Sequence, residues 1–334
     1  MDVARLNFSH GTHEEHARRL ESIRAADREL GKAVGVLQDL CGPKVRTGDG
    51  GPASLANGET IRLVPGTLGT DDTLAVNYER LTHSVAERDR ILLSDGAIEL
   101  SVESVLRDAV ICRVEHGGTL RPRTGVNLPS GKLELAAITE KDKADLEVGL
   151  EAGVDFVALS FVRSARDIAA LRELCAAASP SPRLVAKIET PAAVEEIEEI
   201  ARAADGVMVA RGDLGVELPP AVVPPIQKHI IDTCRTLRRP VVVATEMLQS
   251  MVHASRPTRA EASDVANAVF DGADATMLSA ETAIGEDPAL ACRTMARIIA
   301  EAEASPYVDL RPSPPSGKPP ASIAKAACTV AQET

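Results

Sequence analysis

Four short clusters of charged and polar residues have types and spacing suited to chemistry, and each directly follows an apolar run of strand length. The clusters are Lys187–Glu189, Arg211–Gly215, Thr245–Glu246 and Ser279–Thr282. The carboxyl ends of parallel strands meet at one edge of a sheet or barrel, where active sites form. Side chains also alternate along a strand, so Lys187 and Glu189 lie on the same side. We therefore expect the clusters to converge.

A magnesium-assisted reaction on a phosphate is the chemistry that these residue types favour. Glu189 and Asp213 offer the hard oxygen ligands that Mg²⁺ prefers. Positive charge for a phosphate comes from Arg5, Arg46, Lys187 and Arg211. Together they predict phosphoryl transfer, in which positioning and electrostatic stabilisation dominate. The alternative is that each residue belongs to a structural ion pair at the mouth of a barrel.

Seven candidate strands alternate with amphipathic stretches, the pattern of βα units around a parallel sheet. A helix over 12–30 follows the first strand, and Thr190-Pro191, Ser164–Asp167 and Thr258–Glu261 are helix start signals. Seven strands are one short of a closed eight-stranded barrel, and an open doubly wound sheet is the alternative. The candidate strands are Asp2–Leu6, Val34–Gln38, Asp155–Leu159, Leu184–Ile188, Gly206–Val209, Pro240–Ala244 and Ala273–Leu278.

A second pattern interrupts these units. Period-two runs such as Glu59–Val64, Ala97–Val102 and Ala109–Val114 predict a small β domain inserted after a strand. A proline-rich stretch over 311–320 predicts a linker, and a helical pattern begins again at Ala321. The expected organisation is a barrel domain over 1–47 and 125–306, an inserted domain over 48–124, and a linker with the start of another domain over 307–334.

Composition excludes several functions. Thirty-seven Lys and Arg against 49 Asp and Glu give a net charge of −12, which disfavours nucleic acid and anionic membranes as partners. No long apolar run or signal peptide is present, and six scattered cysteines fit a reducing cytoplasm. His10, His13 and His16 are better explained as a solvated helix start than as a metal cluster.

These residues resemble the pyruvate kinase family over almost the whole chain. The family's motifs occur in order as MDVARLNFSHG (1–11), DLCGPKVRTG (39–48), GVNLP (125–129), AKIE (186–189), MVARGDLGVE (208–217), ATEMLQSM (244–251) and the segment 256–285. The resemblance implies a β/α barrel with an inserted β domain closing over the site. It also implies transfer of a phosphoryl group from phosphoenolpyruvate to ADP, giving pyruvate and ATP.

The resemblance implies a role for each matching residue. Lys187 would stabilise charge on the phosphoryl group and the enolate oxygen, Arg5 would hold the transferring phosphate, and Thr245 would lie near the site of enolate protonation. Substrate contacts would come from Arg5, Arg211, Gly212, Asp213 and Thr245, nucleotide contacts from Asn7, His10 and Arg46, and a proton-relay network from Ser279 and Glu281.

The resemblance also implies a metal requirement. Glu189 and Asp213 would bind Mg²⁺, with Mn²⁺ as a substitute. Many members bind K⁺ through residues matching Asn7, Ser9, Asp39 and position 40, which here is Leu40 and cannot ligate. Lys44 stands where those members have Glu, and its ammonium would replace the missing ion. We therefore expect a requirement for Mg²⁺ and none for K⁺.

The family's first barrel strand and helix are expected before Met1, and its C-terminal α/β regulatory domain after the linker. The expected fold is thus a (β/α)8-type barrel lacking its first strand, with an inserted small β-barrel domain and the start of a truncated C-terminal domain. Full-length members are tetramers, so a homo-oligomer is expected. Two alternatives stay open, a catalytically inactive fragment that pairs with an intact subunit, and another phosphoenolpyruvate- or pyruvate-handling barrel enzyme such as a lyase.

Overall fold

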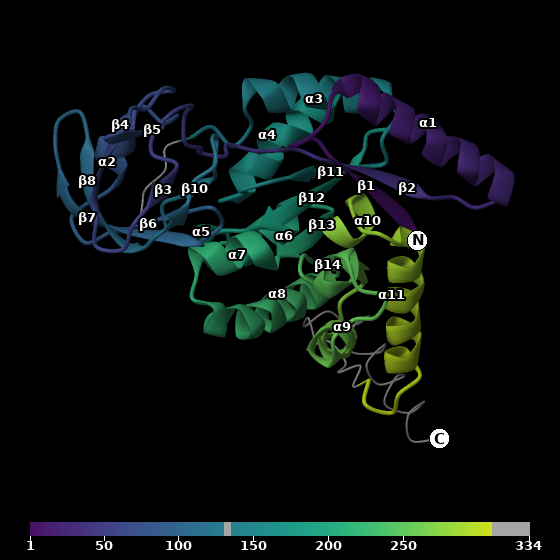
Figure 1. Ribbon diagram of the computed structural model, residues 1–334. Helices are drawn as coiled ribbons and strands as arrows, with labels where there is room; N and C mark the ends of the chain where they lie inside the picture. Colours follow the sequence, from purple (N-terminus) through teal and green to yellow (C-terminus); the bar gives the residue numbers. More distant parts are fainter. Residues whose placement is uncertain (130–134, 309–334) are drawn as a thin grey trace. The chain divides into compact units, whose positions relative to one another are not determined.

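The computed structural model describes residues 1–129 and 135–308, which form two compact units (Figure 1). The first unit comprises Met1–Leu40, Lys141–Gly212 and the described residues from 222 onward. The second comprises Cys41–Glu140 and Asp213–Ala221. The predicted linker and the helical pattern that follows it, over 309–334, lie outside the described residues.

A seven-stranded parallel sheet organises the first unit, and its strands follow one another in chain order. A doubly wound sheet reverses its strand order at a switch point, so that alternative is wrong here. Among the described residues, the first and last strands each pair with a single neighbour, as expected for a barrel that lacks one strand. The strands are β1 (Val3–Asn7), β2 (Gly35–Asp39), β11 (Phe156–Leu159), β12 (Arg183–Ile188), β13 (Gly206–Ala210), β14 (Val241–Ala244) and β15 (Ala275–Met277).

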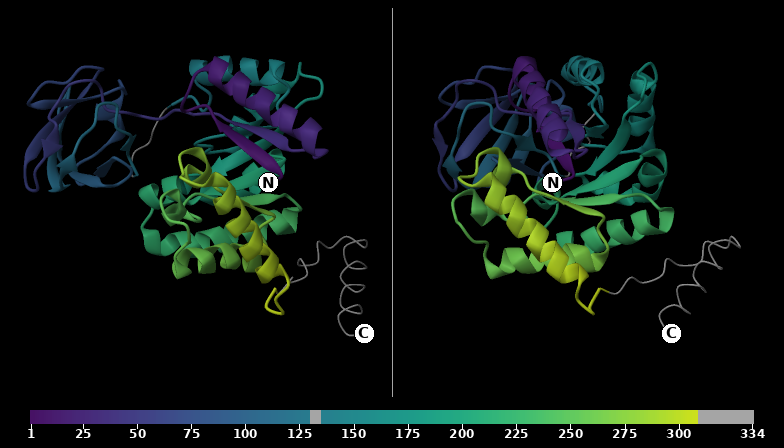
Figure 2. Two further views of the ribbon diagram at one scale, coloured as in Figure 1. Left: turned by 45° about the vertical axis from the view of Figure 1, so that its right-hand side comes forward. Right: turned by 90° about the vertical axis from the view of Figure 1, so that its right-hand side faces the viewer.

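Helices lie around this sheet (Figure 2), and their start signals act as predicted. The Thr190 and Thr258 side chains accept hydrogen bonds from the first helical turn, and Pro191 is the first helical residue. The helices and 3-10 turns that alternate with these strands are α1 (His13–Leu30), α3 (Glu140–Glu151), α4 (Ala165–Cys175), α5 (Pro191–Glu195), α6 (Ile197–Ala203), α7 (Arg211–Glu217), η1 (Pro220–Val222), α8 (Val223–Leu237), η2 (Gln249–Val252), α9 (Arg259–Asp271), α10 (Ala280–Ala283) and α11 (Pro288–Glu303). Most of α7 and of η1 falls in Asp213–Ala221 and so belongs to the second unit.

One face of the strands carries an apolar cluster. Five strands each contribute one buried residue to a single apolar cluster there, namely Leu37, Ala158, Val185, Met208 and Ala244. Because side chains alternate along a strand, the residues two positions further along, among them Asp39, Ser160 and Lys187, continue the same face at the carboxyl ends.

The second unit is built on a six-stranded sheet in the order β10-β6-β7-β8-β4-β5, in which only β4 and β5 pair in parallel. The period-two runs become strands because their alternate residues fill its apolar core. Its elements are β3 (Ser54–Leu55), β4 (Thr60–Pro65), β5 (Thr73–Val76), α2 (Leu81–Ser84), β6 (Arg90–Leu93), β7 (Ile98–Val105), β8 (Val110–His116), β9 (Gly118–Thr119) and β10 (Val126–Asn127).

This unit is larger than the predicted inserted domain over 48–124. It begins at Cys41 and also takes in Asp213–Ala221, which the sequence pattern assigned to the barrel. Asn127 donates a 2.7 Å hydrogen bond from Nδ2 to Glu217 Oε1, and this contact between distant segments cannot be read from local periodicity.

Both units contain buried free thiols. Cys112 lies in the core of the second unit, and Cys175 and Cys234 lie in that of the first. Burial raises the pKa of Cys112 and of Cys234 to about 12, so these thiols stay protonated. Among the described cysteines, only Cys41 and Cys292 are partly exposed.

The prediction of a solvated helix start is wrong for His16. The residue is only 3% exposed, and its ring stacks on Phe8 with ring centroids 4.0 Å apart, while Nε2 lies 2.8 Å from the carbonyl oxygen of His10. Through these contacts with Phe8 and His10, the His16 side chain connects the loop after β1 to α1. Burial lowers the pKa of His16, although its bond to the His10 carbonyl opposes that shift.

We expect this histidine to make the protein less stable in mild acid. The pKa of His16 is lower in the folded protein than in the unfolded chain. Its contribution to the free energy of unfolding is therefore complete above the ordinary pKa of 6.5 and is lost as the pH falls through the pKa of the folded state. Protonation would place an N–H at Nδ1, which has no hydrogen-bond partner in the described chain. Urea unfolding at pH 5.5 and pH 7.5 measures the effect.

The control is His16→Gln, whose amide does not titrate. We expect this variant to lose much of the difference in unfolding free energy between the two pH values. Arg19, Glu15 and Asp145 also act electrostatically on His16, and they remain in the variant. An unchanged pH dependence in His16→Gln would contradict the assignment.

Candidate active site

Lys187 is the centre of a buried charged cluster at the carboxyl end of β12. Its ammonium donates a 2.6 Å hydrogen bond to Ser160 Oγ and lies 2.8 Å from Glu189 Oε1 and 3.2 Å from Asp39 Oδ1. The side chain is 10% exposed. Burial alone would lower its pKa, but the two carboxylates outweigh burial and raise it, so Lys187 is a fixed cation.

Asp39 bridges two cations. One carboxylate oxygen faces Lys187, and the other accepts a 2.6 Å hydrogen bond from Arg5 Nε. Burial would raise the pKa of Asp39, but Lys187 and Arg5 hold it below its ordinary value. Arg5 lies on β1 and Asp39 ends β2, its parallel neighbour, so sheet register brings the two side chains together.

Glu189 orders the chain after β11. Its Oε2 accepts a 2.7 Å hydrogen bond from the backbone N–H of Phe161, whose φ of 53° is in the left-handed region. Side chains other than glycine rarely adopt that conformation. Ser160 and Phe161 were missed in the sequence, although Ser160 directly follows a predicted strand, as the four recognised clusters do.

The predicted substrate contacts Arg211, Gly212 and Thr245 lie together at the ends of β13 and β14. Arg211 pairs with Asp264 at 2.7 Å and donates to the backbone carbonyl of Thr245, also at 2.7 Å. The Gly212 N–H, expected to hold the substrate carboxylate, donates to Thr245 Oγ1 at 2.8 Å. The three residues thus form one hydrogen-bonded group.

The residues predicted to relay a proton lie after β15. Glu281 is fully buried, and its two oxygens accept hydrogen bonds from the backbone N–H groups of Leu248 and Ser279. It therefore joins the segment after β14 to the start of α10. The Ser279 hydroxyl is buried and has no hydrogen-bond partner in the described residues.

The end of β1 and the loop after it carry three of the residues predicted to contact the nucleotide or a monovalent cation, namely Asn7, Ser9 and His10. Asn7 Oδ1 accepts a 3.1 Å hydrogen bond from the Ser9 N–H, and the carbonyl of His10 faces His16. Leu40 is completely buried. Its hydrocarbon side chain cannot ligate an ion there.

Within the second unit, Lys44 Nζ lies 3.9 Å from Asp213 Oδ1 and 3.9 Å from Asp95 Oδ1. Arg46 donates from Nη1 to the carbonyl of Arg123 at 3.2 Å. Lys44 is thus the cation beside one predicted magnesium ligand. Hydrogen bonds and ion pairs thus join Lys187 with Glu189, Asp39 and Arg5, and separately Arg211 with Gly212 and Thr245, in the first unit, while Lys44 pairs with Asp213 in the second.

The donor chemistry of Glu189 and Asp213 fits Mg²⁺. The described residues contain no cluster of three or more His, Cys, Asp or Glu side chains that could hold a metal. Magnesium does not need one, because it commonly takes one or two carboxylates and completes its shell with water and substrate oxygens. His10, His13 and His16 do not come together as such a cluster.

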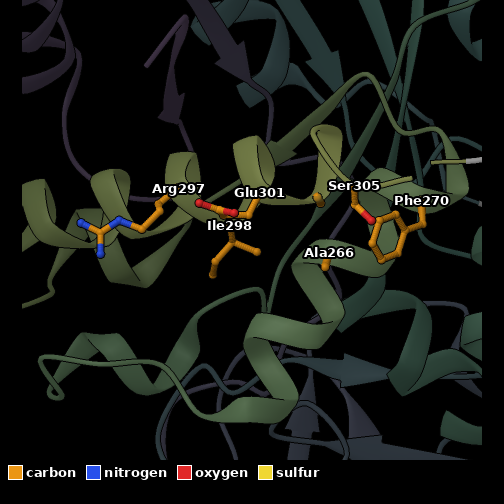
Figure 3. Close-up of a pocket in the computed structure, with 7 residues that line it drawn as sticks. Ala266, Phe270, Arg297, Ile298, Glu301 and Ser305 are labelled. Carbon is orange, nitrogen blue, oxygen red and sulfur yellow. The ribbon is translucent and has the colours of Figure 1, made fainter. Parts of the chain in front are cut away.

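A cavity of about 360 Å³ lies elsewhere, between α9 and α11 (Figure 3). Its lining is mainly apolar and includes Phe270, Ile298 and Ala302. It contains none of the clustered strand-end residues.

No helix in the described chain combines the length and apolarity that crossing a bilayer requires.

Comparison with known proteins identifies the family. The model of the pyruvate kinase barrel domain matches residues 1–292. The chain belongs to the pyruvate kinase family. A pyruvate kinase from Mycobacterium intracellulare is 49% identical over 306 residues, covering 91% of this chain and 65% of that protein. One from Agrobacterium vitis is 45% identical over 339 residues, covering 99% of this chain and 70% of that protein.

A solved structure confirms the fold. The crystal structure of a pyruvate kinase from Cryptosporidium parvum matches with a TM-score of 0.87 at 39% identity, over 91% of this chain and 64% of that one. The chain thus spans between 53% and 70% of the length of the pyruvate kinases to which it was compared.

Proposed function

We propose that this chain catalyses magnesium-dependent phosphoryl transfer from phosphoenolpyruvate to ADP, giving pyruvate and ATP. The observation that carries the proposal is the buried Lys187 ammonium, held among Asp39, Glu189 and Ser160 at the strand ends of a pyruvate kinase barrel. A cation fixed before the reaction stabilises charge that develops during transfer without reorganising.

The residues around Lys187 complete the proposed site. Arg5 would hold the transferring phosphate, and its bond to Asp39 fixes the orientation of its planar guanidinium. Thr245 would contact substrate at the position where the enolate is protonated. Arg46, Asn7 and His10 would contact the nucleotide.

Glu189 and Asp213 would hold the Mg²⁺ ion. When bound, the ion would neutralise negative charge on the phosphoryl group and the substrate oxygens. Asp213 is one third exposed and has Lys44 as its charged neighbour. The Glu189 carboxylate is held in place by the hydrogen bond that it accepts from the Phe161 N–H. Mn²⁺ has the same preference for oxygen ligands and would substitute for Mg²⁺.

Pyruvate formation by the purified chain tests the proposal. The assay contains phosphoenolpyruvate, ADP and Mg²⁺, and is repeated without ADP and with Lys187→Met. We expect pyruvate only when ADP is present and Lys187 is intact. Pyruvate without ADP would favour another phosphoenolpyruvate-handling enzyme, and no pyruvate from the wild-type chain would favour an inactive fragment.

We expect turnover without K⁺. Leu40 offers no ligand, and Lys44 supplies a fixed positive charge. Replacing K⁺ by tetramethylammonium at constant ionic strength should leave kcat nearly unchanged, because a charge built into the chain needs no diffusible ion. Loss of turnover in tetramethylammonium would contradict this. Lys44→Glu, which replaces the positive charge by a negative one, should make turnover dependent on K⁺.

The cellular setting belongs to the same proposal. Free, scattered cysteines support the cytoplasm, and the net charge of −12 argues against nucleic acid and anionic membranes as partners. A homo-oligomer is proposed from the family resemblance.

A further inference from the structure

The turn that follows β14 has an unusual backbone. Thr245 and Glu246 have φ values of 69° and 54°, so two consecutive side-chain-bearing residues occupy the left-handed region. Such conformations persist only where the surrounding structure imposes them, and they gather at functional sites. Contacts from outside the turn must therefore hold it.

Arg211 supplies one of these contacts. Its Nη2 donates to the Thr245 carbonyl at 2.7 Å, and its Nη1 contacts both carboxylate oxygens of Asp264 on α9, at 2.7 and 2.8 Å. The Arg211 side chain is only 11% exposed. A guanidinium fixed in this way points its charge at the turn and at α9.

Gly212, the residue after Arg211, holds the side-chain hydroxyl of Thr245. The Gly212 N–H donates to Thr245 Oγ1 at 2.8 Å, and that hydroxyl donates to the Ala244 carbonyl at 2.6 Å. Arg211 and Gly212 thus fix the carbonyl and the hydroxyl of Thr245 together. Rotation of the turn would break both bonds.

We propose that Arg211 is a positioning residue that sets the orientation of the Thr245 hydroxyl, and that Asp264 keeps Arg211 in place. This inference rests on the proposed function, in which Thr245 lies where the enolate is protonated. It replaces the expected role of Arg211 as a direct substrate contact. Its consequence is that proton delivery depends on an ion pair whose partner, Asp264, lies on α9.

The test uses Arg211→Met with a matched control. Arg172→Met removes an arginine of the same kind, which donates to the Ala203 carbonyl at 2.8 Å and pairs with Asp205 at 3.2 Å. Thermal unfolding shows whether each variant folds. Asp264→Asn is a milder second variant, because it leaves Arg211 intact and removes only its charged anchor.

The first readout needs no turnover. In a chain labelled at threonine methyl groups, the Thr245 resonance is assigned with Thr245→Ser. We expect it to shift or broaden in Arg211→Met and Asp264→Asn and to stay unchanged in Arg172→Met. An unchanged Thr245 resonance in folded Arg211→Met would overturn the proposal whatever the activity.

The second readout is kinetic. Arg211→Met should lower kcat by about 10- to 100-fold, the loss expected when a reacting group is misplaced, with little change in KM for ADP. Exchange of the pyruvate methyl protons with deuterated water should slow in parallel, because it reports on the proton donor. A raised KM for phosphoenolpyruvate with an unchanged exchange rate would contradict positioning and restore a direct substrate contact.

The two readouts separate this inference from the proposed function. If the wild-type chain forms no pyruvate while the Thr245 resonance still depends on Arg211, the proposed function fails and the positioning contact stands. If the wild-type chain is active and the Thr245 resonance does not depend on Arg211, the proposed function stands and the positioning role of Arg211 fails.

Discussion

We expect Lys187→Met to lower kcat for pyruvate formation by about 10³-fold, the loss that follows when a fixed charge that stabilises the transition state is removed. The ammonium lies within 3.2 Å of two carboxylates and a hydroxyl. A cation from solvent would not be held at the same position in the variant. The KM for ADP should change little, because Lys187 acts on the transferring group. Steady-state kinetics with both substrates varied measures these effects.

The same substitution should also destabilise the fold. Removing one partner of a buried ion pair leaves an uncompensated buried charge and lowers the free energy of unfolding by about 3–5 kcal/mol. In this variant the uncompensated charges are the carboxylates of Asp39 and Glu189. Urea unfolding therefore accompanies the kinetics, and rates are measured where the variant is folded. Lys228→Met is the control, because it removes another lysine paired with a carboxylate, that of Asp271, outside the site. A Lys187→Met enzyme that keeps more than a tenth of the wild-type kcat would contradict the assignment.

Glu189→Gln is expected to weaken metal binding by at least about 10-fold, and turnover with it. The amide is neutral, so the chain loses one of the two proposed metal ligands and one of the carboxylates beside Lys187. An amide oxygen can still accept the Phe161 N–H, so the left-handed turn after β11 should persist. Titration with Mn²⁺, followed by the paramagnetic signal of the free ion, measures binding without turnover.

Glu261→Gln is the matched control for this variant. Glu261 is also a carboxylate that accepts backbone N–H groups, those of Ser250 and Thr258, and it lies at the start of α9. It should bind Mn²⁺ as the wild-type chain does. Asp213→Asn should weaken binding as Glu189→Gln does. Wild-type affinity in both Glu189→Gln and Asp213→Asn would exclude these residues as the metal ligands.

Local sequence patterns predicted the strands and helix starts of the first unit well. Apolar runs of strand length found all seven strands of the parallel sheet, and the period-two rule put Lys187 and Glu189 on one side, where they form an ion pair. The capping pattern at Thr258 also became a helix start. These features depend on residues close together in the chain.

Partners distant in the chain were not predictable in the same way. The bond between Lys187 and Ser160 depends on how β11 and β12 align, and the pair of Arg211 and Asp264 depends on how α9 packs. His16 shows the same limit, since its polar character suggested solvent while Phe8 covers it. Charge and periodicity identify which residues can act, but tertiary packing decides what each one touches.

The buried thiols give each unit its own reporter of opening. A disulfide reagent reacts with thiolate, so Cys112 cannot react until the core of the second unit opens, nor Cys175 or Cys234 until that of the first does. Labelling under native conditions, followed by mapping of the modified cysteines, would therefore give a separate opening free energy for each unit. The partly exposed Cys41 and Cys292 would react first and calibrate the intrinsic rate.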